Sequence, residues 1–287
     1  MMEGNLLKLE HFASHDGPGI RLVVFLKGCP LRCRWCHTPE SQHPEPELLY
    51  QQEKCLHCGV CGNIFEKTAP PVSQTDVENC PAGALKIAGF RMSAETIIAE
   101  AEKERIFFDE SGGGLTISGG EPLFQKEFCF SLLRLAAERG IRCCVETSGF
   151  GDPDALKSWI PYVEWFLFDW KETDPELHHR FTGEDNRLIL RNLNLLNREG
   201  ASIILRCPLI PGVNARPDHL KGIARLAEQL DHVKEIHIEP YHPLAAGHYR
   251  QLHREMPSLP KEFPPPAVVE AWRRQIAEFT AKPVIIP

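Results

Sequence analysis

IRLVVFLKGCPLRCRWCH, residues 20–37, places an apolar run directly before three closely spaced cysteines. The run at 20–26 is rich in β-branched and aromatic residues, which predicts a buried strand. Cys29, Cys33 and Cys36 therefore fall in the loop at the carboxyl end of that strand. Because α/β enzymes keep their chemistry at this end of their strands, the three cysteines are the first candidates for a functional site.

Several kinds of site contain three cysteines. Three thiolates bind a cubane iron–sulfur cluster through three of its irons, which leaves the fourth iron open to a substrate. A structural zinc site needs four ligands, and His37 directly follows Cys36, which argues against both binding one metal. Unliganded or redox-active thiols are the third alternative. A disulfide framework fits worst, because the chain has 11 cysteines and no secretory signal.

The spacing Cys-x3-Cys-x2-Cys at 29–36 resembles the signature of the radical S-adenosylmethionine (SAM) superfamily. DGPGIR, residues 16–21, resembles a motif of one branch, the glycyl radical enzyme activating enzymes typified by pyruvate formate-lyase activase. The resemblance implies that the open iron binds the amino and carboxylate groups of SAM. It also implies that an electron from the cluster cleaves SAM to methionine and a 5′-deoxyadenosyl radical, which takes hydrogen from a glycine of a partner enzyme.

A second group of cysteines follows a proline-broken connector at 41–46 and resembles a ferredoxin ligand run: Cys55, Cys58, Cys61 and Cys80, the last followed by proline. A two-cluster ferredoxin has another cysteine at the position of Phe65, so we expect one [4Fe-4S] cluster here. A zinc knuckle of four thiolates is the alternative. The predicted organisation is a radical SAM core at 1–48 and 91–287, interrupted by a ferredoxin-like insert at 49–90.

From residue 91 helical and strand-like segments alternate. We expect helices at 94–109, 128–139, 188–198 and 266–279, and strands at 115–117, 141–145, 163–168, 201–207 and 233–238. With the strand at 20–26 this makes six β/α units, which form a parallel sheet with right-handed crossovers. A closed barrel needs eight units, so six predict an α/β fold that is an open partial barrel or a doubly wound sheet. The resemblance favours a partial (β/α)6 barrel with a lateral gap for a partner's loop.

Polar residues collect where these strands end, which is the pattern of an active site. In SGGEP, residues 118–122, the glycines allow a close backbone approach and Glu121 can accept from an ammonium. Asp169 and Lys171 flank Trp170 and point to one side of an extended chain. Considered alone, the glycine motif has a tight turn as its less favoured alternative, whereas a simple ion pair is as good an explanation of Asp169 and Lys171 as a functional pair.

The resemblance assigns functions to these strand ends. Gly119, Gly120 and Glu121 match the glycine-rich motif that binds the amino group of SAM. Asp169 and Lys171 match an Asp-x-Lys element near SAM and the target glycine, which makes them the catalytic candidates. Both are also candidates for cofactor binding, together with Trp35, Cys36, His37, Ser148, Arg206 and His242.

Two of these candidates rest on their positions at strand ends. We expect Arg206 to contact the carboxylate or ribose of SAM and His242 to contact its adenosine, with ordinary surface or core roles as the alternative. Glu146, Thr147 and Asp169 resemble residues that hold a monovalent cation beside SAM in pyruvate formate-lyase activase. That enzyme has aspartate in place of Glu146 and methionine in place of Leu167.

The remaining features limit the class of protein. At 287 residues with 43% hydrophobic composition, the chain is long enough to bury a full core. A formal charge of −7 without a Lys/Arg cluster argues against nucleic acid, and without an apolar run of about 18 residues we expect no membrane span. The loop at 209–214 is expected to be shaped without chemistry, and four cysteines to be core residues: Cys129, Cys143, Cys144 and Cys207.

These features predict a cytoplasmic activase that installs a glycyl radical on a partner enzyme and receives electrons from a donor such as flavodoxin or ferredoxin. The alternatives are a radical SAM enzyme acting on a small molecule and an electron-transfer iron–sulfur protein. The second leaves the glycine motif and the Asp169–Lys171 pair without a purpose. By resemblance, pyruvate formate-lyase is a poor candidate partner, because its own activase lacks the insert, which relatives serving dehydratases, decarboxylases and C–S or C–N lyases often carry.

Metal analysis tests the two cysteine groups separately. Two cubane clusters predict about eight irons per reconstituted chain, and a variant with all four insert cysteines changed to alanine about four. That variant should keep the SAM-induced change in its EPR spectrum and activate its partner poorly. About four irons and one zinc in anaerobically purified protein would contradict the ferredoxin interpretation without affecting the radical chemistry.

Overall fold

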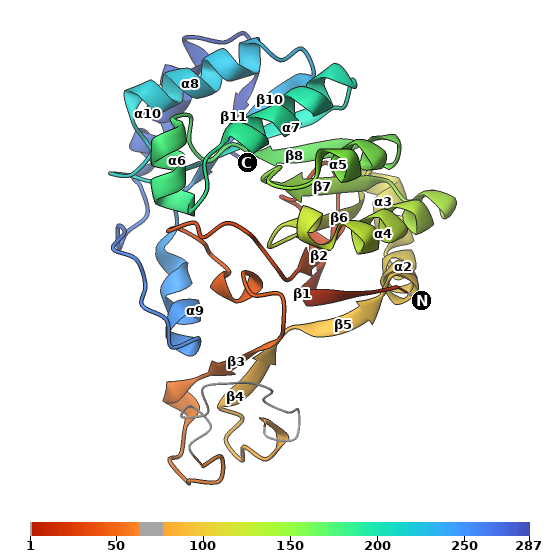
Figure 1. The fold of residues 1–287 in the computed structure, drawn as a ribbon, viewed down its shortest axis with the longest axis vertical. Coiled ribbons are helices and arrows are strands. Elements are labelled where there is room, and N and C mark those ends of the chain that lie inside the picture. The colour runs from red at the N-terminus through yellow and green to blue at the C-terminus, as the bar shows by residue number, and fades with distance from the viewer. Residues whose placement is uncertain (1, 63–76) are drawn as a thin grey trace.

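The computed structural model describes residues 2–62 and 77–287, so Phe65 lies outside the described residues. The described chain is organised around one sheet with the strand order β11-β10-β9-β8-β7-β6-β2-β1-β5 (Figure 1). Its strands are β1 (Glu3–Ala13), β2 (Arg21–Leu26), β5 (Phe90–Ser93), β6 (Gly114–Gly119), β7 (Cys143–Thr147), β8 (Trp165–Asp169), β9 (Ile203–Leu209), β10 (Val233–Pro240) and β11 (Val284–Ile285).

The six predicted strands are the central ones, and they run parallel from β2 through β6, β7, β8 and β9 to β10. The predicted α/β fold with a parallel sheet is confirmed. Among the described strands β5 and β11 stand at the two edges and do not pair, so the sheet forms an open partial barrel. The helices are α2 (Ala94–Lys103), α3 (Arg105–Ser111), α4 (Lys126–Glu138), α5 (Pro153–Trp159), α6 (Pro175–Thr182), α7 (Arg187–Arg198), α8 (Pro217–Glu228), α9 (Ala246–Gln251) and α10 (Pro266–Ala277).

The core lies between the sheet and the helices that cover its outer face. In α4 the side chains of Phe128, Leu132 and Ala136 recur every four residues and are buried together, so one helical face packs on the sheet. Along β9 the neighbours of Arg206 enter this core, while Arg206 itself points to the opposite, inner side. The four cysteines assigned to the core from the sequence are buried.

One local prediction was wrong, and one strand was missed. The single helix expected at 94–109 is broken at Glu104, whose buried carboxylate is bonded to His11 and lies 3.4 Å from the backbone N–H of Phe12. These contacts with β1 separate α2 from α3. The strand β1 was not predicted, because its charged residues hide the alternation, yet it pairs antiparallel with β2 and β5 and extends the sheet. Ser93 caps α2 by accepting from the N–H of Thr96 at 3.1 Å.

The insert carries its own two-stranded antiparallel sheet, in which β3 (Glu47–Tyr50) pairs with β4 (Leu85–Ala88). It projects from the lower end of the molecule in Figure 1. Lys27, fully buried at the end of β2, lies 3.5 Å from the carboxylate of Glu47 and also donates to the carbonyl of Glu40. Arg254, after α9, pairs with the same Glu47 and donates to Pro39 O at 2.8 Å. The insert is thus attached to the loop that carries the first three cysteines.

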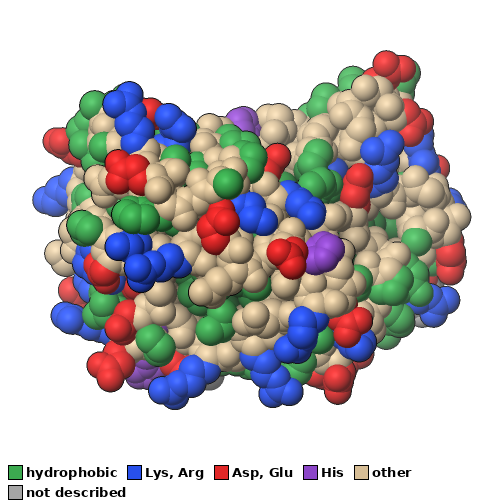
Figure 2. All heavy atoms as spheres, turned by 90° about the horizontal axis from the view of Figure 1, so that it is seen from above, with side chains coloured by type: hydrophobic (Ala, Val, Ile, Leu, Met, Phe, Trp, Pro, Cys, Tyr) green, Lys and Arg blue, Asp and Glu red, His purple; other side chains and the backbone are tan. Residues whose placement is uncertain are grey.

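The surface shows no sign of a basic binding face from the side seen in Figure 2. Lys and Arg side chains alternate there with Asp and Glu, and no continuous basic area forms. Within residues 2–62 and 77–287, none of the helices has the length and apolar character needed to cross a membrane.

The pairing of β2 with β6 gives a stability test. Gly119 pairs with Leu26 and has a φ of +115°, and a Cβ there would lie 2.0 Å from the N of Leu26. Gly119→Ala should therefore lower the free energy of unfolding by at least about 1–3 kcal/mol in urea titrations. Gly247→Ala, in α9 with nothing within 4 Å of its Cβ, is the matched control and should leave stability unchanged or slightly higher. Equal stability of both variants would contradict the close approach.

Candidate active site

A cavity of about 390 Å³ opens at the carboxyl ends of the parallel strands. The three cysteines of the first motif line it together with the strand ends of β6, β7, β8, β9 and β10. The site residues expected from the sequence that line this one cavity are Cys29, Cys33, Trp35, Cys36, His37, Gly119, Gly120, Ser148, Asp169, Lys171, Arg206 and His242. The parallel topology thus brings residues as far apart in the sequence as Cys29 and His242 to one place.

The three motif cysteines fit a cluster better than they fit thiol chemistry. All three are free, and burial raises the pKa of the Cys33 thiol to about 12 and that of the Cys36 thiol above its usual value. A protonated thiol is a poor nucleophile, whereas metals bind the thiolate form, so these pKa values favour ligation over thiol chemistry. Within the described part of the chain no three His, Cys, Asp or Glu side chains converge on a single-ion site. All three cysteines line the cavity.

The glycine motif lies directly against the cysteine loop. The N–H of Gly120 donates to Leu26 O at 2.8 Å and that of Glu121 to Gly28 O at 2.9 Å. A Cβ on Gly120 would lie 2.4 Å from Gly28 O. The glycines do permit a close approach, but the neighbour is the backbone leading into Cys29. The close approach to a ligand that the sequence predicts stays a prediction. The motif is therefore a turn that shapes the cavity beside the cysteines.

Glu121 occupies a different place from the one expected. Its carboxylate is fully buried behind the cavity and does not line it. One oxygen accepts from Leu123 N at 3.1 Å and from the hydroxyl of Thr147, and the other accepts from Ser148 N at 2.9 Å and from the hydroxyl of the same serine. The expectation that this carboxylate binds the SAM ammonium directly is therefore corrected. Glu121 ties the β6 turn to the end of β7.

The inner wall of the cavity carries paired charges. Lys171 Nζ lies 2.7 Å from Asp169 Oδ2. Burial alone would lower the pKa of Lys171, but the Asp169 carboxylate and the nearby sulfurs of Cys33 and Cys29 together hold this pKa above its usual value. Arg206 lies 3.1 Å from Glu146 and 2.9 Å from Glu239. Its guanidinium thus already has two carboxylate partners, and contact with SAM stays a prediction.

A cluster of rings also lines the cavity. The imidazoles of His37 and His242 are stacked with ring centroids 3.5 Å apart. His37 Nε2, His242 Nδ1 and the hydroxyl of Tyr241 are buried without a hydrogen-bond partner. Buried polar atoms normally have partners, so these three mark where a polar and partly aromatic ligand would bind. An adenosine group has that chemistry.

Sequence reasoning missed several cavity residues. Asp16 and Glu239 line the cavity, and burial raises the pKa of Asp16. Asp16 belonged to a recognised motif and Glu239 to a predicted strand end, so both signals were present. Tyr241, which directly precedes His242, also lines the cavity and was given no role from the sequence. Asn214, in the loop predicted to lack chemistry, is fully buried and bonded to the carbonyl of Lys171.

The four insert cysteines line a second cavity of about 270 Å³. All four are free. Backbone N–H groups point at two of their sulfurs, from Ala84 to Cys80 at 3.3 Å and from His57 to Cys55 at 3.4 Å. The bond from Ala84 is the main cause that lowers the pKa of Cys80, which favours the thiolate form that metals bind. Four thiols around one cavity are a donor set that metals bind, although their side chains do not converge on a single-ion site within the described part of the chain.

The buried carboxylate of Glu121 gives a second test. In Glu121→Gln either orientation of the amide sets its NH2 against a backbone N–H, of Leu123 or of Ser148. We expect the free energy of unfolding to fall by about 1–3 kcal/mol, because a buried donor loses its acceptor. Glu127→Gln, at a side chain that is 69% exposed, is the control and should change little. Weaker SAM binding without any loss of stability would instead support direct contact with SAM.

Comparison with known proteins identifies the family. The model of the radical SAM superfamily matches residues 23–227. The choline trimethylamine-lyase activating enzyme of Oleidesulfovibrio alaskensis is 34% identical over 88% of this chain and 88% of its own. The trans-4-hydroxy-L-proline dehydratase activating enzyme of Clostridioides difficile is 33% identical over 96% of this chain and 98% of its own. The pyruvate formate-lyase 2-activating enzyme of Escherichia coli is 33% identical over 95% and 89%.

Solved structures agree. A domain of pyruvate-formate lyase-activating enzyme from Bacteroides vulgatus superposes with a TM-score of 0.50 at 27% identity, covering 61% of this chain and 99% of that one. SuiB of Streptococcus suis bound to S-adenosylmethionine shares the fold with a TM-score of 0.59 at 10% identity, over 90% of this chain and 48% of that one. Membership implies a [4Fe-4S] cluster and SAM. This chain belongs to the radical SAM superfamily and, within it, to the activating enzymes that generate glycyl radicals on partner enzymes.

Proposed function

We propose that Cys29, Cys33 and Cys36 hold the SAM-binding cluster, and that Asp169 and Lys171 act beside the target glycine of the partner. One observation carries this proposal: motif cysteines and strand-end residues chosen from the sequence line a single cavity. When bound, the cluster supplies the electron that cleaves SAM reductively, and the radical formed takes hydrogen from the glycine. The enzyme's own residues bind and orient these groups.

Each wall of the cavity has a proposed role. The turn at Gly119 and Gly120, with Ser148 next to it, offers backbone and hydroxyl groups beside the cysteines for the amino-acid part of SAM. Trp35, His37 and His242 form the aromatic end, where unpartnered ring nitrogens suit adenosine. With these two parts of the cavity assigned to SAM, the wall that carries Asp169 and Lys171 remains for the partner's glycine, which loses hydrogen. Water exclusion by the buried walls protects a radical in transit.

We also propose a second [4Fe-4S] cluster in the insert at 49–90, held by Cys55, Cys58, Cys61 and Cys80. The cavity that these residues line and the N–H groups directed at their sulfurs support a metal centre, and zinc remains the alternative outcome of the iron analysis. Its four thiolates leave no open iron, so its role is electron transfer or structure. The separate β3–β4 sheet supports the proposed division into core and insert.

Further parts of the proposal concern partners and location. The relatives serve lyases, dehydratases and decarboxylases at similar identities of 32–38%, so identity does not favour one glycyl radical enzyme. A flavodoxin or ferredoxin is the proposed electron donor and the cytoplasm the proposed location; nucleic acid and membrane are not proposed as partners.

A monovalent cation beside Glu146 and Asp169 has less support, because both carboxylates already have cationic partners.

The test is a glycyl radical EPR signal from candidate partner enzymes incubated anaerobically with the reduced protein and SAM. Cys33→Ala should abolish 5′-deoxyadenosine formation while far-UV circular dichroism stays unchanged. Lys171→Gln should bind SAM within about threefold of wild type and lower the yield of glycyl radical per 5′-deoxyadenosine by about tenfold or more. Undiminished SAM cleavage by Cys33→Ala, or a normal radical yield with Lys171→Gln, would overturn the corresponding assignment.

A further inference from the structure

The loop that follows Lys171 is held by side chains that come from other parts of the fold. Three consecutive carbonyls, those of Lys171, Glu172 and Thr173, each accept from an asparagine amide at 2.9 Å. Asn214 donates to the first and Asn186 to the other two. Beyond the end of β8 these amides take the place of the strand bonds that would otherwise fix the backbone.

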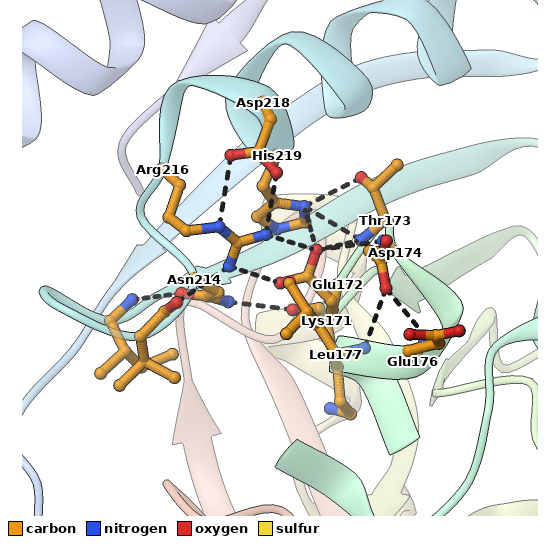
Figure 3. A network of polar contacts seen from close by, with 12 residues as sticks. Lys171, Glu172, Thr173, Asp174, Glu176, Leu177, Asn214, Arg216, Asp218 and His219 are labelled. Atoms are coloured by element: carbon orange, nitrogen blue, oxygen red, sulfur yellow. Dashed lines mark hydrogen bonds and ion pairs between the residues drawn. The ribbon is translucent and has the colours of Figure 1, made fainter. Parts of the chain in front are cut away.

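Asn214 connects two strand ends directly behind Lys171. Its amide nitrogen also donates to Pro208 O at 2.7 Å, and its oxygen accepts from Ile210 N at 2.7 Å. The side chain is fully buried, and both amide N–H groups and the oxygen are used. The loop after β8 is thereby fastened to the loop after β9 through one residue (Figure 3).

An ion pair fastens the same loop from its outer side. Glu172 is fully buried and accepts from Arg216 at 2.9 and 3.2 Å and from the N–H of Thr173 at 2.8 Å. His219 lies 3.5 Å from Glu172, but burial lowers the pKa of this histidine to about 4, and its Nδ1 accepts from Thr173 N at 3.1 Å. His219 is therefore neutral, and Arg216 is the cation that compensates Glu172 (Figure 3).

The side chains that hold this loop do not line the cavity: Asn186, Asn214, Glu172 and Arg216. They reach it through backbone groups of lining residues, the carbonyls of Lys171 and Pro208 and the N–H of Ile210, and Lys171 is the one of these three with a charged side chain. A lysine side chain is long and has many rotamers, so the position of its ammonium group depends on where its backbone is held. Lys171 Nζ lies 2.7 Å from Asp169, and a backbone shift would change that pair. Misplacement of a reacting group by about 1 Å can cost about a hundredfold in rate.

We propose that Asn214 and the Glu172–Arg216 pair are positioning residues that hold Lys171 in place during hydrogen abstraction. They would determine how many SAM cleavages lead to a glycyl radical, while leaving SAM cleavage itself intact. This inference rests on the role proposed for Lys171.

The experiment measures glycyl radical formed per 5′-deoxyadenosine with a responsive partner enzyme. Asn214→Asp keeps the shape but sets a carboxylate against the carbonyls of Lys171 and Pro208. We expect this ratio to fall by about ten- to a hundredfold, with SAM affinity and iron content within about threefold of wild type. Asn194→Asp is the matched control, because its amide donates to a carbonyl at 2.8 Å on the exposed side of α7, and it should keep the wild-type ratio.

Glu172→Gln provides an independent variant, since its amide oxygen can still accept from Thr173 N while the charge facing Arg216 is lost. We expect Glu172→Gln to lower the same ratio by about three- to tenfold. If Asn214→Asp folds poorly, its ratio is measured on the folded fraction. General destabilisation lowers both products together and leaves the ratio unchanged. Wild-type ratios in the folded fractions of both variants would overturn the proposal.

A double variant separates this inference from the function it rests on. If Asn214 acts through Lys171, the double variant Asn214→Asp with Lys171→Gln should form as much glycyl radical per 5′-deoxyadenosine as Lys171→Gln alone. Multiplied losses would show that Asn214 acts by another route and would overturn the inference alone. A wild-type ratio for Lys171→Gln alone would instead refute the proposed role of Lys171, and the inference with it.

Discussion

The contact between the end of β2 and the end of β6 is the constraint on which the site depends. Leu26 and Gly28 approach Gly119 and Gly120 so closely that any Cβ on the second pair would collide with backbone atoms. This approach places the cysteine loop beside the glycine turn. It thereby brings the candidate cluster ligands to the cavity at the carboxyl ends of the parallel strands. Burial of β2, whose inner and outer faces are both covered, makes the contact rigid.

The open sheet gathers the charged ends of its parallel strands in one cavity, while its edge strands β5 and β11 do not pair with each other. Inside, four carboxylates face two cations, and each cation has at least one carboxylate partner: Asp16, Glu146, Asp169 and Glu239 against Lys171 and Arg206. Pairing offsets the cost of burying these charges and fixes their geometry before a ligand arrives.

The loops beyond the strands need a different kind of support. Where strand bonds stop, buried amides and carboxylates hold the chain: Glu121 behind the glycine turn, and Asn186, Asn214 and Glu172 behind Lys171. None of these four side chains lines the cavity. A side chain that satisfies several backbone groups at once loses a buried hydrogen bond on almost any substitution. The residues around the cavity are thus held by a second layer that has no chemistry of its own.

The sequence alone determined the local features of this protein. Short motifs named the cysteines, the glycine turn and the Asp169–Lys171 pair, and hydrophobic periodicity located the six parallel strands, because both signals arise between near neighbours in the chain. Tertiary structure decided what depends on distant contacts. It placed Glu121 behind the cavity and paired Arg206 with two carboxylates. It also broke the helix at Glu104 and bonded Asn214 to the carbonyl of Lys171. Burial and hydrogen-bond partners from remote strands set those outcomes, and local sequence patterns do not encode them.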